Sequence, residues 1–237
     1  MGIGIMDSTM FGRRSIRTQF LVALGFSTLC SVGLFAYGAW HNHTDAFLYL
    51  LWNLFLAWIP VLITFRLLHV LSYKLWSAWE SLLTTLVWLL FLPNSFYMIS
   101  DFIHLQQVPS ASVLYYSVVF TSFIYTGVAL GFASLFLVHL QLKKRRHVGV
   151  CAAWIGLILL CCSVAMYIGR DLRWNSWDIL TNPGGLIFDM SYRLIHPAQY
   201  PEVLAVIVPF FVLLVGMYAL VWHSTRVVRA STRTMRS

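Results

Sequence analysis

The chain has 237 residues, of which 59% are hydrophobic, 16% are aromatic and only 10% are charged. Its mean hydropathy of +0.77 is far above that of water-soluble domains, which excludes a soluble globular protein. The aromatic content also excludes a disordered chain, because disorder requires few apolar residues and many charges. The formal net charge of +8 is compatible with nucleic acid or anionic lipid as a partner, so the positions of the charges must decide.

Charge-poor windows long enough to cross a membrane are the main feature of the sequence. About 20 residues of α-helix cross the roughly 30 Å of hydrocarbon in a bilayer. Six windows meet this requirement: Phe20–Trp40, Ala46–Phe65, Ser81–Ser100, Val113–Leu140, Val148–Gly169 and Val203–Trp222. The sequence therefore predicts an all-α integral membrane bundle of about six transmembrane helices. The fourth window is longer than needed, which predicts a tilted or partly interfacial helix.

The predicted membrane domain covers residues 20–223, between a basic N-terminal segment at 1–19 and a basic tail at 224–237. Connections between the windows are short except for residues 170–201, which are numerous enough to form re-entrant or interfacial helices. The first window exceeds the apolar core of about 7–15 residues found in secretory signals. We therefore expect it to remain as a membrane helix.

Lys and Arg residues are distributed very unevenly between the two sides of these windows. The outer side holds only Arg170, Arg173 and Arg193. Because loops rich in Lys and Arg stay in the cytoplasm, both termini are predicted to be cytoplasmic and the protein to lie in the inner cell membrane. The charge is thus mainly a topology signal, and no nucleic-acid partner is expected. The basic residues assigned to the cytoplasmic side are Arg13, Arg14, Arg17, Arg66, Lys74, Lys143, Lys144, Arg145, Arg146, Arg226, Arg229, Arg233 and Arg236.

The third window carries the first group of candidate site residues. Pro93 lacks a backbone donor and disturbs the helix, which frees a carbonyl about one turn earlier, near Leu89. Asn94 is placed to occupy this gap. If the helix resumes after the break, Asn94, Asp101 and His104 share one helix face.

Asp101 and His104 are compatible with three roles. They can form a hydrogen-bonded pair that holds the helix end, bind an ion or ligand, or act as a general acid and base. Ionisable groups at membrane depth are costly, so their positions are the best pointer to function. A metal site needs at least three ligands, and the spacing supplies no second pair of strong ligands, so we predict no metal and no cofactor.

The second group of candidate residues follows the fifth window. On a helix, Arg170 and Arg173 share a face with two tryptophans, whereas Asn175 and Asp178 lie on a neighbouring face. This pattern indicates either an interfacial belt of Trp and Arg or an arginine clamp for an anionic headgroup, phosphate or carboxylate. We also expect at least one contact between a carboxylate, Asp101, and one of these arginines.

Three further polar groups indicate structural roles. Asn53, in the second window, is predicted to form a hydrogen bond between helices. Glu80 is predicted to pair with Lys74 or Arg66. The four cysteines all lie inside the windows and are predicted to be small apolar lining rather than disulfides: Cys30, Cys151, Cys161 and Cys162.

One run of the third window consists of Leu89-Leu90-Phe91-Leu92-Pro93-Asn94, followed by Tyr97, Asp101 and His104. Together with the Arg-Trp-Asn-Ser-Trp-Asp core of residues 169–178 and the weaker segment Asn53–Pro60, it resembles the domain of unknown function 1361 family. These are bacterial multi-pass membrane proteins, and the resemblance covers roughly residues 45–220. The family has no agreed activity, so the resemblance implies the fold and the position of a site but no function.

Three functions are compatible with these residues. The preferred one is outward-facing binding or transport of a small anionic or lipid-like ligand. It rests on Arg170, Arg173 and a broken helix at Pro93, because discontinuous helices often line ligand cavities. The second is an integral-membrane enzyme acting on lipid or envelope precursors, with Asp101 and His104 as acid/base or ligand groups. The third is an accessory or scaffolding protein. Membrane lipids are the expected partners, and the sequence identifies no protein partner.

Overall fold

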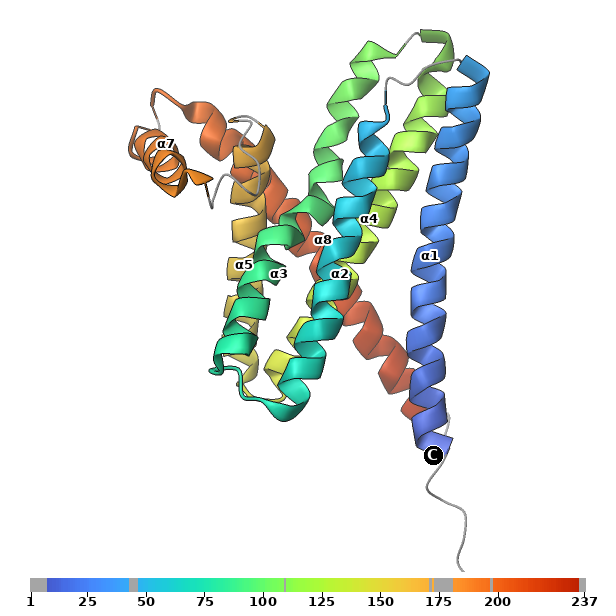
Figure 1. Ribbon diagram of the computed structural model, residues 1–237, viewed down its shortest axis with the longest axis vertical. Coiled ribbons are helices and arrows are strands. Elements are labelled where there is room, and N and C mark those ends of the chain that lie inside the picture. The colour runs from blue at the N-terminus through green and yellow to red at the C-terminus, as the bar shows by residue number, and fades with distance from the viewer. Residues whose placement is uncertain are drawn as a thin grey trace, which may run out of the picture.

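The computed structural model describes residues 8–42, 47–108, 110–170, 172, 181–196 and 198–234. Within these residues the chain forms seven α-helices and two 3-10 helices and no strand (Figure 1). They are α1 (Ser8–Asn42), α2 (Tyr49–Tyr73), α3 (Trp79–Tyr97), η1 (Met98–Gln107), η2 (Ser110–Ser112), α4 (Val113–Lys143), α5 (Val148–Arg170), α7 (Pro183–Ile195) and α8 (Pro201–Thr234).

Six segments are long and apolar enough to cross a membrane. Each contains most of one predicted window, so the prediction of six membrane helices is confirmed at this level. The protein is a multi-pass membrane protein, and its lipid-facing helices imply contact with membrane lipids. The segments are Thr18–His41, Tyr49–Tyr73, Trp79–Gln107, Ser110–Lys143, Val148–Arg170 and Pro201–Val227.

Several helix ends differ from the predicted ones. Helix α2 continues to Tyr73 instead of ending at Phe65. The predicted end was set by the charge of Arg66, but this side chain is exposed while Leu67 and Val70 remain fully buried in the core. A long Arg side chain can carry its charge away from apolar surroundings, so one charge does not end the helix. Helix α8 likewise extends well into the basic tail.

The predicted break at Pro93 is wrong. Helix α3 continues through Pro93 to Tyr97, and only then does the chain tighten into the 3-10 helix η1, which begins at Met98. Proline is tolerated inside membrane helices where local adjustments and neighbouring groups satisfy the freed backbone. The irregular stretch of the third span therefore lies one turn beyond the proline and includes Asp101.

Helix α4 is the central helix of the bundle. Its most apolar window is 67% buried, against 17–44% for the other five spans. It packs against α1, α2, α3, α5 and α8. Figure 1 shows α4 behind α2, with α1 to the right of both. The remaining helices therefore bury one face on α4 or its neighbours and leave another face for lipid.

Two glycines let α4 approach α3 closely. A Cβ on Gly127 would lie 2.6 Å from the Met98 sulfur and 2.9 Å from the Ser95 carbonyl oxygen. A Cβ on Gly131 would lie 2.8 Å from the Phe96 ring and from the Ser95 Cβ. Small residues four apart are a common means of close helix packing in membranes. The pair fixes the position of α3, and hence of the 3-10 helix that follows it.

A buried network of hydrogen bonds joins α2, α3 and α4 next to this close contact. The Thr64 hydroxyl donates to the Pro60 carbonyl at 2.8 Å and lies 2.7 Å from the Ser134 hydroxyl. The indole of Trp88 donates to the same Ser134 oxygen at 2.7 Å. Every polar side chain of this group has a partner, as burial in an apolar bundle requires.

Helix α7 lies in the long segment predicted to be interfacial. Asn182 caps it by accepting a hydrogen bond from the Gly185 backbone amide at 3.1 Å. Its exposed apolar side chains include Ile187, Phe188 and Ile195. Figure 1 shows α7 beside the bundle, near α5 and the start of α8. A short helix with one exposed apolar face suits the membrane–water interface.

Two smaller predictions are confirmed. Glu80 pairs with Lys74 at 2.7 Å. The four cysteines are free, and the adjacent Cys161 and Cys162 lie on different sides of α5, the first exposed and the second buried.

Candidate functional site

Asp101 is the most deeply buried carboxylate in the described part of the chain, with 3% of its surface exposed. It lies in η1, and its Oδ2 accepts a hydrogen bond from the Asn53 side-chain amide of α2 at 3.1 Å. This bond joins two helices, as expected of Asn53, but the sequence did not indicate that Asp101 would be the partner. An ionisable group at this depth indicates a candidate functional site.

Arg170, at the end of α5, is a source of positive charge that acts on Asp101. Its guanidinium interacts electrostatically with the Asp101 carboxylate. The expected direct contact is not formed by Arg170, because the ion pairs within 4 Å among the described residues are Lys74–Glu80 and Arg193–Glu202. Arg170 is partly buried, and no hydrogen bond from its side chain reaches another residue that the structure describes.

The third and fifth spans meet beside Arg170. The Tyr97 hydroxyl donates to the Gly169 carbonyl at 3.3 Å, which ties the end of α3 to the end of α5. Asn94 does not take part in this contact, because its amide donates to the Phe91 carbonyl of its own helix at 3.2 Å. It therefore satisfies a local backbone group, though not the one near Leu89, and does not reach Asp101.

Tyr49 is a neighbour of both Asp101 and His104. Its ring centroid lies 5.2 Å from that of His104, and its hydroxyl interacts electrostatically with Asp101. This buried hydroxyl has no hydrogen-bond partner among the described residues. His104 in turn contacts the Gln107 amide at 3.3 Å. Asp101 and His104 thus share a neighbour but form no hydrogen bond with each other in the part of the chain described.

Sequence reasoning missed Tyr49, although a signal for it exists. Tyr49 and Asn53 are four residues apart, so they occupy one face of α2, and both approach Asp101. An aromatic residue at the end of a span is normally an interfacial anchor. That usual role made a contact of Tyr49 with Asp101 hard to recognise from the sequence.

Residues 52–221 match the model of a family described as a protein of unknown function, DUF1361. The chain belongs to the DUF1361 family. The match includes Asn53, Asp101 and Arg170 and begins after Tyr49, and it confirms the resemblance expected from the sequence. No curated protein and no solved structure matches the chain significantly. The family description assigns no activity, so function must be argued from the site.

Three candidate residues of this DUF1361 protein lie outside the described residues: Arg173, Asn175 and Asp178. Within the described ranges, no group of three or more His, Cys, Asp or Glu side chains is placed to hold a metal. The candidate site is therefore a cluster of Tyr49, Asn53, Asp101 and Arg170, with His104 next to Tyr49.

Proposed function

We propose that this protein is an inner-membrane module with an outward-facing site, and that the site binds a small anionic or lipid-like ligand. The observation that carries the proposal is a pair of donors beside Asp101. The Arg170 guanidinium and the buried Tyr49 hydroxyl both interact with this carboxylate electrostatically, and neither has a hydrogen-bond partner among the described residues.

The buried Tyr49 hydroxyl in particular favours an acceptor that belongs to a ligand. A buried donor without a partner costs about 1–3 kcal/mol, and a phosphate or carboxylate oxygen would satisfy it. Arg is well suited to this because its planar fork matches the oxygens of both groups. The Asn53 amide holds the Asp101 carboxylate in place. In this arrangement Asp101 attracts the arginine through its charge and limits which anions can enter.

The ligand-binding proposal can be tested with Arg170→Gln. We expect the purified full-length protein in detergent to bind glycerol 3-phosphate, an anion without acyl chains, about tenfold more weakly, because one charge-assisted hydrogen bond is lost. The measurement is titration calorimetry. Arg193→Gln is the matched control. It removes the same charge, but from an arginine that already has Glu202 as a partner at 3.7 Å. Equal affinity of Arg170→Gln and the unmodified protein would contradict the proposed site.

The outward orientation rests on the partition of basic residues, with 13 on the cytoplasmic side and Arg170, Arg173 and Arg193 on the other, which together make up the total of 16. Single cysteines at His43 and Arg145, in a chain whose four native cysteines are replaced, provide a direct test. A membrane-impermeant maleimide added to intact cells should label position 43 and leave position 145 unlabelled. Labelling of position 145 from outside would show that the proposed orientation is the wrong way round.

A further inference from the structure

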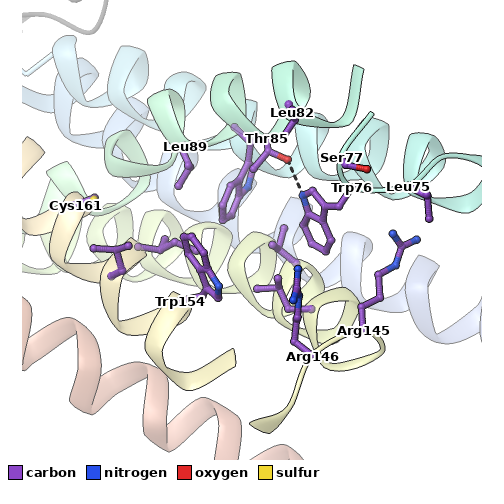
Figure 2. A pocket seen from close by; sticks show the side chains of 15 residues that line it. Leu75, Trp76, Ser77, Leu82, Thr85, Leu89, Arg145, Arg146, Trp154 and Cys161 are labelled. Atoms are coloured by element: carbon purple, nitrogen blue, oxygen red, sulfur yellow. Dashed lines mark hydrogen bonds between the residues drawn. The ribbon is translucent and has the colours of Figure 1, made fainter. Parts of the chain in front are cut away.

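A separate cavity lies at the opposite end of the bundle from Asp101. It has a volume of about 640 Å³ and lies between α3, α4 and α5 (Figure 2). Its walls are mainly apolar and include Trp88 and Leu89 of α3 together with Trp154 and Leu157 of α5. The volume is within the range of about 300–1,000 Å³ that is usual for ligand sites. No residue of the Asp101 cluster lines it.

Two arginines stand at one end of this cavity. Arg145 and Arg146 belong to the connection between α4 and α5, and Figure 2 shows them at the opposite end from Cys161. Arg145 donates to the Leu71 carbonyl at the end of α2 at 3.2 Å, which fixes its position. The exposed Arg146 side chain makes no hydrogen bond or ion pair with any residue that the structure describes. No carboxylate lines the cavity.

The long axis of the cavity runs in the direction in which a lipid lies in a membrane, from a headgroup position toward the membrane interior. Trp154, Leu157 and Cys161 lie along one side of α5, and from Trp154 to Cys161 the helix rises about 10 Å toward the membrane interior. Apolar walls at this depth favour a hydrocarbon chain, whereas the cationic end favours an anionic headgroup. Basic pockets between membrane helices are a known way of selecting anionic lipids.

We propose that this cavity binds one anionic phospholipid, with an acyl chain between α3 and α5 and its phosphate at Arg145 and Arg146. A free phosphate would satisfy the arginines but leave the apolar walls uncovered. A zwitterionic lipid would fill the walls without a net charge for the arginines. This site is distinct from the outer one proposed above, and its occupant enters from the leaflet at the basic end of the bundle.

The headgroup contact is tested by native mass spectrometry of the full-length protein with added phosphatidylglycerol or phosphatidylcholine. The unmodified protein should bind phosphatidylglycerol more tightly than phosphatidylcholine. Arg145→Gln with Arg146→Gln should weaken phosphatidylglycerol binding about tenfold or more, because two cations near the phosphate are removed. Lys143→Gln with Lys144→Gln removes the same charge at the end of α4, from residues outside the cavity, so it should change binding less than threefold.

The acyl-chain contact is tested by Cys161→Phe, which fills the inner end of the cavity. It should weaken phosphatidylglycerol binding, whereas Cys30→Phe, at the other exposed cysteine, should not. Inorganic phosphate at millimolar concentration should not displace the lipid. Equal effects of the arginine and lysine pairs, or displacement by phosphate, would overturn the proposal.

Discussion

Gly127→Ala should destabilise the bundle by about 2 kcal/mol, a large effect for the addition of one methyl group. The new Cβ would lie 2.9 Å from the Ser95 carbonyl oxygen, which belongs to the backbone of α3 and cannot turn aside. Helix α3 must then move away from α4, and this loosens the packing that positions η1. Gly131→Ala should cost a similar amount, because its Cβ would lie 2.8 Å from the Ser95 Cβ, which is fixed to the same backbone, and from the fully buried Phe96 ring.

The matched control is Gly156→Ala in α5, where a Cβ would meet nothing within 4 Å. Alanine is the better helix former by about 1 kcal/mol, so this variant should be neutral or slightly more stable. Reversible unfolding in mixed detergent micelles provides the comparison. If Gly127→Ala and Gly156→Ala unfold at the same denaturant fraction, α3 and α4 do not pack as closely as described.

Asn53→Ala should cost about 2–3 kcal/mol, because it removes the amide that donates to the buried Asp101 carboxylate. Asp101→Asn should cost less, since a neutral amide is cheaper to bury and still offers an acceptor to Asn53. The double variant Asn53→Ala with Asp101→Asn should be more stable than the sum of the single losses predicts, because no unpaired charge remains.

Asn94→Ala is the control for this series. Its amide donates to the Phe91 carbonyl within the same helix, so its loss should cost under about 1 kcal/mol. The same unfolding assay applies to all four variants. Additive losses at positions 53 and 101 would show that the two side chains are energetically independent. The hydrogen bond from Asn53 would then not hold Asp101 in place.

The six spans could be predicted because apolar length is a property of the sequence alone. Their ends could not, since Arg66 looks like a boundary until the burial of Leu67 and Val70 beside it is known. The two glycines of α4 form a small-residue pattern visible in the sequence. The sequence does not show which helix they face, and the structure assigns them to α3.

The charged members of the candidate cluster could be proposed from the sequence as site residues, whereas its neutral members could not. Asp101 and Arg170 stand out because charges are costly near a bilayer. Asn53 and Tyr49 are ordinary residues of a membrane helix, and only the packing of α2 against η1 gives them Asp101 as a common neighbour. Pro93 suggested an irregular helix, but the position of the irregularity depends on how α3 fits against α4.

The winding of η1 has its own consequence for these side chains. A 3-10 helix completes a turn in three residues, so Asp101 and His104 lie directly in line along one edge, whereas an α-helix would offset them by about 60°. Both can therefore face Tyr49 at the same time. Ten residues wound this way also extend about 20 Å, roughly 5 Å more than the same residues in an α-helix. A change that relaxes η1 into an α-helix would thus turn His104 away from Tyr49 and shorten the span, with every residue of the cluster unaltered.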